Sequence, residues 1–139
     1  MKAVIAVVSG VILGGIVNMA LNSVSGKVIP LPPGVDPNDL ESLKANMHLF
    51  EARHFIFPLL AHGMGSLVGA ATAACLAPSH PMRYAIGIGL FTMLGGIAMV
   101  FMLPAPTWYI AADLIGCYLP MAWLGGKIGG TLNRSSAAH

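Results

Sequence analysis

Long runs of apolar residues, separated by short polar or proline-containing segments, are the dominant pattern of this chain. They cover residues 3–21, 55–77, 85–103 and 108–124. A helix of about 20 residues rises by 1.5 Å per residue and so spans the roughly 30 Å hydrocarbon core of a bilayer. The pattern therefore predicts an all-α integral membrane protein, a four-helix bundle of antiparallel transmembrane helices.

Short connections that contain proline separate the last three runs. Residues 78–81 are Pro-Ser-His-Pro and residues 104–106 are Pro-Ala-Pro. Proline ends helices because it lacks a backbone N–H, and connections this short make consecutive helices antiparallel neighbours. We expect residues 1–139 to form a single transmembrane domain.

The longest connection is the predicted outer loop, residues 22–54. Within it, Asp36 is a natural N-cap for a helix. Apolar residues then recur with helical spacing at Leu40, Leu43, Met47 and Phe50. The segment predicts an amphipathic helix that lies on the bilayer surface or caps the bundle.

The composition supports lipid, rather than water, as the solvent of the chain. Hydrophobic residues make up 56% of the sequence and charged residues 9%, whereas soluble domains carry about 25% charged residues. The net charge of +2 is too small to indicate a nucleic-acid partner. Cys75 and Cys117 lie inside apolar runs and are interpreted as reduced packing residues.

The distribution of charge predicts an orientation. An even number of spans places both termini on one side, and that side carries basic residues without any acid: Lys2, Arg83, Lys127 and Arg134. The outer loop mixes both signs of charge. The positive-inside rule therefore predicts cytoplasmic termini. In general appearance, short spans with an outer Pro-Pro-Gly loop resemble small bacterial inner-membrane proteins, and this resemblance implies that location.

Small residues spaced by four form stripes that predict helix contacts. The first run contains Gly10 and Gly14, the second contains Gly65 and Gly69, and the fourth contains Gly116. Such stripes let helix backbones approach closely in lipid. They indicate packing within the bundle or, as the alternative, contact between copies in a homo-oligomer.

A few polar residues within the runs form the candidate site. Asp113 is the only acid and His62 the only histidine inside a run, and Asn18 and Ser66 lie at comparable depth. A charge buried in lipid needs a partner, so we expect a hydrogen bond between His62 and Asp113. One interpretation is a purely structural polar network. The other is an outward-facing cavity that handles a proton, an ion or a small ligand, with His62 as the group that titrates near neutral pH.

Motifs for metal, cofactor or covalent chemistry are incomplete in this sequence. Glu51 and His54 match the Glu-x-x-His spacing of di-iron bundles, but those sites need two such motifs and further glutamates. Ser66 lacks the Gly-x-Ser-x-Gly surroundings of a nucleophile elbow. We therefore expect no enzyme activity, no catalytic residue, no metal and no cofactor.

Two functional hypotheses remain from the sequence. The first is a small non-enzymatic accessory or structural subunit that self-associates or binds a larger membrane complex. The second is a small transporter or channel-like protein that uses the Asn18, His62 and Asp113 site. The expected partners are the lipid bilayer and either further copies of the chain or other membrane-protein subunits.

Overall fold

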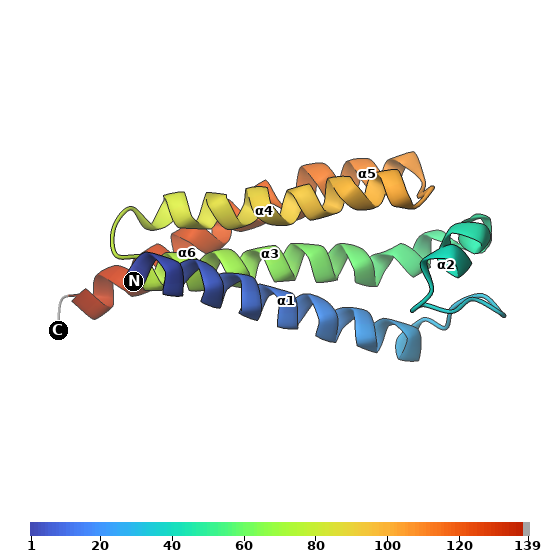
Figure 1. Cartoon of the computed structure of the whole chain (residues 1–139), viewed down its shortest axis with the longest axis horizontal. Helices are drawn as coiled ribbons and strands as arrows, with labels where there is room; N and C mark the ends of the chain where they lie inside the picture. The colour runs from blue at the N-terminus through green and yellow to red at the C-terminus, as the bar shows by residue number, and fades with distance from the viewer. Residues whose placement is uncertain (138–139) are drawn as a thin grey trace.

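The computed structural model describes residues 1–137 of the chain, and within that range it contains helices and turns but no strand. The long helices are α1 (Lys2–Val28), α3 (Ile56–Leu76) and α4 (Pro81–Met102). Figure 1 shows them running side by side along the longest axis. Three helices are long and apolar enough to cross a membrane: α1, α4, and α3 together with its preceding turn. The predicted all-α fold is confirmed, and three of its helices have the length and composition that a membrane span requires.

The fourth apolar run does not form the single continuous helix that we expected. It begins as α5 (Thr107–Ala112), widens into the π-helical turn η3 (Asp113–Cys117) and continues as α6 (Leu119–Ala137). The helical path thus extends well beyond residue 124. Neither α5 nor α6 is among the helices long and apolar enough to cross a membrane, so a fourth span remains a prediction.

The first helix is longer than the predicted span, which was to end at Leu21. Nothing between residues 22 and 28 breaks a helix, and polar side chains there bond to the helix backbone itself. Asn22 Nδ2 donates to the Asn18 carbonyl at 3.1 Å, and Ser23 Oγ donates to the Met19 carbonyl at 2.8 Å. The helix ends only at Ile29, directly before Pro30.

The predicted amphipathic helix is shorter and starts later than expected. Asp36 Oδ1 accepts a hydrogen bond from the Asn38 N–H, which closes a turn and not a helix. The N-cap is Asp39, and α2 (Leu40–Asn46) is only 7 residues long. The short 3₁₀ turns η1 (Met47–Leu49) and η2 (Ala52–Phe55) then lead into α3.

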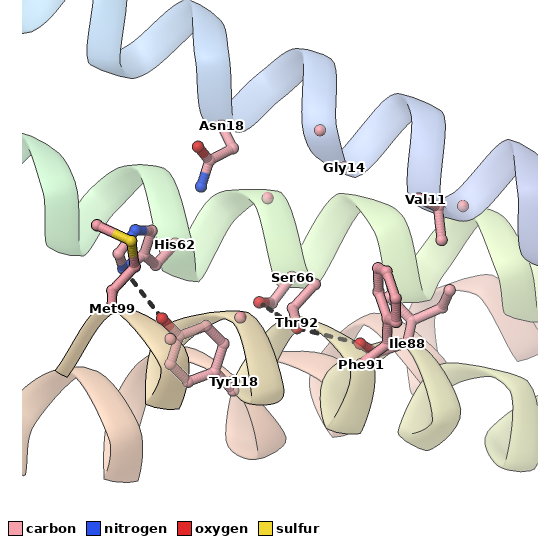
Figure 2. Close-up of a pocket in the computed structure, with 15 residues that line it drawn as sticks. Val11, Gly14, Asn18, His62, Ser66, Ile88, Phe91, Thr92, Met99 and Tyr118 are labelled. Carbon is pink, nitrogen blue, oxygen red and sulfur yellow. Dashed lines mark hydrogen bonds between the residues drawn. The ribbon is translucent and has the colours of Figure 1, made fainter. Parts of the chain in front are cut away.

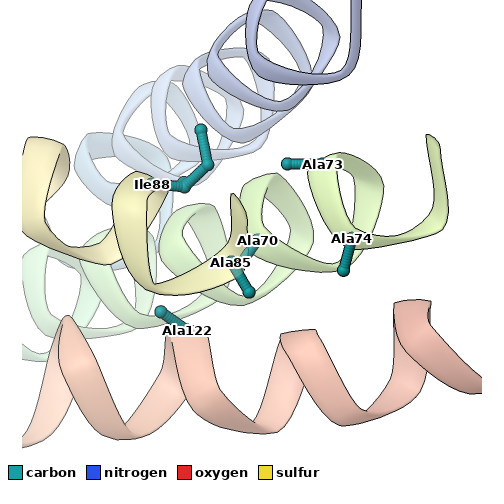
Figure 3. Packing of buried hydrophobic residues seen from close by; sticks show 6 residues of the cluster. All are labelled: Ala70, Ala73, Ala74, Ala85, Ile88 and Ala122. Carbon is teal, nitrogen blue, oxygen red and sulfur yellow. The ribbon is translucent and has the colours of Figure 1, made fainter. Parts of the chain in front are cut away.

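The centre of the bundle is α3, which packs along α1, α4 and α6. One cluster of the buried apolar core consists of alanines on α3, α4 and α6 together with one isoleucine on α4. Figure 3 shows its members: Ala70, Ala73, Ala74, Ala85, Ile88 and Ala122. Side chains this small let the helix backbones lie close together, so dispersion contacts between backbones stabilise the bundle.

The glycine stripes of α1 and α3 face each other, as the sequence predicts. A Cβ at Gly10 would lie 2.7 Å from the Gly69 carbonyl oxygen, and one at Gly14 would lie 2.6 Å from the Gly65 carbonyl oxygen. The prediction for Gly116 is wrong within the chain, because Gly116 is exposed and a Cβ there would meet nothing within 4 Å. The π turn sets the direction in which this residue faces.

Candidate ligand-binding site

A partly buried hydrogen bond links α3 to the π turn. His62 Nδ1 lies 2.8 Å from Asp113 Oδ1, which confirms the predicted hydrogen bond between these residues. Asp113 is only 4% exposed. A carboxylate at such a position is costly unless it is paired, and the imidazole supplies one of its partners.

Tyr118 supplies the second partner, which the sequence analysis missed. Its hydroxyl donates to Asp113 Oδ2 at 2.7 Å and also lies 3.1 Å from His62 Nδ1. Its ring stacks on the imidazole with the centroids 5.8 Å apart. Space for the ring comes from Gly96 on α4, where a Cβ would lie 2.6 Å from the tyrosine Cζ. His62, Asp113 and Tyr118 are named the triad below.

The π turn explains why Asp113 and Tyr118 meet. Residues five apart in an α-helix point about 140° away from each other. A π turn holds more residues per turn through i to i+5 hydrogen bonding, so it brings such a pair onto one face. The turn spans Asp113–Cys117, and Tyr118 follows it directly. A π turn of this kind is frequently found at functional sites.

The other predicted polar residues lie near the triad but do not join it. Ser66 is buried and bonds to Thr92 Oγ1 at 3.2 Å; the threonine hydroxyl in turn donates to the Ile88 carbonyl at 3.0 Å. Asn18 Oδ1 accepts from Asn22 Nδ2 at 3.1 Å. Ser66 and Asn18 nevertheless border the same cavity as His62.

This cavity is a groove of about 360 Å³ between α1 and α4, with α3 as its floor. Its lining is mostly apolar and rich in glycine, and Figure 2 shows Asn18, His62 and Tyr118 at one end and Val11 and Phe91 toward the other. The volume lies in the range of small-molecule sites, which are mainly apolar with a few oriented polar groups.

A second cavity, of about 290 Å³, lies between His62 and the segment that precedes α3. Phe50, His54 and Tyr109 are among its lining residues. His62 borders both cavities. The imidazole is therefore positioned between the groove and the end of the bundle at which α3 begins.

The Glu51–His54 spacing has a structural explanation. The Glu51 N–H donates to His54 Nδ1 at 2.8 Å, and the glutamate side chain caps the same 3₁₀ turn in return. His54 Nε2 lies 3.2 Å from the Pro30 carbonyl oxygen, which ties the end of α1 to the start of α3. Both ring nitrogens of His54 are thus occupied.

The imidazole of His62 is the group available for chemistry. Its Nδ1 faces the Asp113 carboxylate and so carries the proton of the neutral ring, which leaves Nε2 as an acceptor. Among the described residues, no hydrogen-bond partner is found for Nε2, and the side chain is 24% exposed. A neutral His62 accepts a hydrogen bond from a ligand hydroxyl, and a protonated one donates.

Comparison of the chain with protein-family models, with curated proteins and with solved structures found no match. The function is therefore inferred from the geometry of the triad and the groove.

Proposed function

We propose that the chain is a multi-pass protein of the bacterial inner membrane with four spans and cytoplasmic termini. Three helices have the length and hydropathy to cross a membrane. The fourth span would be formed by α5, η3 and the start of α6, because η3 and α6 pack against α3 and α4 and α5 leads directly into η3. From Thr107 to Gly126 the only charged residue is Asp113, and its charge is paired.

Within that protein, the groove binds a small amphiphilic molecule that enters from the bilayer. The observation that carries this proposal is the position of His62, whose free Nε2 borders an apolar groove while its Nδ1 is held by Asp113. A hydroxyl-bearing head would bond to His62, and an apolar chain would lie along α1 and α4. No covalent step is involved, so the proposed role is binding or passage of the molecule.

The groove also has the open side that such a ligand needs. Helix α1 packs closely on α3 but touches α4 only slightly. Gly15 and Gly95 border the groove from α1 and α4, and a Cβ on either would meet nothing within 4 Å. The groove therefore has free space between two helices that both face lipid in the proposed arrangement.

The test is photolabelling with a long-chain alcohol that carries a diazirine on its chain, applied to purified protein in lipid nanodiscs. We expect adducts on groove residues such as Val11 and Phe91. Gly95→Leu adds a side chain at the border of the groove, where a Cβ meets nothing within 4 Å. It should lower this labelling by about tenfold, the effect of removing roughly two methylene groups of the ligand from contact. Gly116→Leu is the matched control, since Gly116 is equally exposed but borders no cavity described above. Equal labelling of both variants would refute the proposal.

The second candidate function is that of an accessory subunit that binds another membrane helix. The outward-facing Gly116 favours it, because a bare glycine on a helix in lipid permits close approach of a partner. The same variants separate the two candidates. Mild detergent extraction would show whether wild type forms an oligomer or binds a stoichiometric partner. If Gly116→Leu abolishes this association and Gly95→Leu does not, the subunit role is favoured.

A further inference from the structure

A third cavity, with a different kind of lining, lies at the opposite end of the bundle from the 290 Å³ cavity that His62 borders. It measures about 540 Å³ and is formed by the first turn of α4 and one face of α6. This is the end at which both chain termini lie in Figure 1. Its lining includes a concentration of cationic and polar side chains: His80, Arg83, Lys127, Thr131 and Arg134.

Within residues 1–137, the positive charge of this cavity has no acidic counterpart. No carboxylate of these residues lines it. Four of the five acids of the chain fall between residues 36 and 51, near the far end of the bundle, and the fifth is Asp113 in the triad. Neither ion pair found in residues 1–137 involves Arg83, Lys127 or Arg134. An anion from outside the chain would therefore complete the site electrostatically.

Helix geometry directs the basic groups toward one another. Lys127, Thr131 and Arg134 follow each other at spacings of four and three, which places them on one face of α6. Gly126 brings that face close to α4, since a Cβ there would lie 2.7 Å from the Met82 Sδ. The N-terminus of α4, a helix of 22 residues, adds the positive end of its dipole.

An aromatic side chain places the cavity at the level of lipid head groups. The Lys127 ammonium lies 4.0 Å from the ring centroid of Trp123, which is 48% exposed. Tryptophan is enriched at the membrane–water interface, where one side of its ring contacts lipid tails and the other contacts water. The basic cavity thus borders the depth at which phosphate groups occur in a bilayer.

We propose that this cavity binds a phosphate-bearing anion, either the head group of an anionic phospholipid or a soluble phosphate ester. Guanidinium groups match phosphate oxygens in a bidentate geometry, and the positive end of a helix dipole favours an anion. Basic pockets between membrane helices on the cytoplasmic side bind anionic head groups by the same chemistry. This site is separate from the groove and does not depend on the ligand proposed there.

The test compares two double variants that remove the same charges at opposite ends. Arg83→Gln with Lys127→Gln takes one cation from each wall of the cavity, whereas Lys44→Gln with Arg53→Gln is the control. All four side chains are exposed, so both proteins should fold. Native mass spectrometry would count phosphatidylglycerol and phosphatidylcholine retained by protein extracted from mixed nanodiscs. A parallel titration of delipidated protein with glycerol 3-phosphate, followed by thermal shift, would probe the soluble anion.

We expect the cavity variant to bind the phosphate probe about 20-fold more weakly than wild type, at about fivefold per basic residue, and the control to stay within about twofold. Retention of phosphatidylglycerol alone would identify a lipid head-group site. Binding of glycerol 3-phosphate with the same dependence on residues would identify a soluble ester site. Equal retention of both lipids by wild type without glycerol 3-phosphate binding, or equal weakening in the two double variants, would overturn the proposal. The Gly95→Leu result would be unaffected either way.

Discussion

At the scale of single residues, the triad illustrates what a sequence of this kind permits one to predict. Asp113 and His62 could be paired in advance because each is the only residue of its type inside an apolar run, and a buried charge needs a partner. Tyr118 could not be added, because its spacing of five from Asp113 indicates opposite faces of an α-helix. Only the π turn brings its hydroxyl to the carboxylate.

A double-mutant cycle should detect the coupling between His62 and Asp113. We expect the stability losses of His62→Ala and Asp113→Ala to be non-additive by about 0.6 to 1.7 kcal/mol, the range measured for hydrogen bonds between membrane helices. The measurement is the free energy of unfolding in detergent micelles. The control cycle joins His62→Ala with Asn133→Ala, which should be additive because Asn133 bonds to the Ala74 and Ala77 carbonyls at the other end of α3. Additivity in the first cycle would mean that the contact contributes nothing to stability.

At the scale of elements, the apolar runs predict where helices lie better than where they end. Hydropathy specifies the part of a helix in contact with lipid. Helix α1 nevertheless continues to Val28, because polar side chains beyond the apolar run form hydrogen bonds with the backbone of the same helix. The start of α2 was misplaced because Asp36 and Asp39 both suit an N-cap, and the turn closed by Asp36 excludes it from the helix. The side of the helix on which Gly116 and Tyr118 lie could not be predicted from their spacing, because a π turn changes the register of a helix.

The glycine contact between α1 and α3 gives a sharp test at this scale. Gly14→Ala places a methyl group 2.6 Å from the Gly65 carbonyl oxygen, and a helix backbone cannot yield locally. We expect a loss of about 1–3 kcal/mol in the free energy of unfolding. Gly15→Ala, one residue further on, meets no atom within 4 Å and should be neutral or slightly stabilising, since alanine favours helix over glycine. Equal thermal stability of the two variants would contradict the contact.

At the scale of the whole molecule, the two ends of the bundle differ in charge. Both ends carry basic residues, but the Asp and Glu side chains outside the apolar runs lie only between residues 36 and 51. A membrane protein retains its more basic short segments in the cytoplasm. The cationic cavity and the proposed orientation therefore follow from the same asymmetry.

Cysteine accessibility in intact cells would test this orientation. In a background with Cys75→Ala and Cys117→Ala, we expect Asn38→Cys to react with a membrane-impermeant maleimide added from outside. Thr131→Cys should react only after the cells are permeabilised. Both positions are exposed in the structure, so a failure to react reports sidedness and not burial. The reverse pattern would invert the topology, and labelling of both positions from outside would exclude an odd number of spans between them, and with it the three spans proposed here.

The packing of the α1 glycines against α3 has a consequence for biosynthesis. This helix emerges from the ribosome before α3, which carries the glycine surface that α1 needs and is translated only after the intervening 27-residue stretch from Ile29 to Phe55. Until then the bare backbone at Gly10 and Gly14 has no matching surface on the nascent chain. Insertion and docking of α1 are therefore separate stages. The groove, which α1 closes on one side, is completed only at the end of assembly, so an immature chain would expose His62 without being able to hold a ligand.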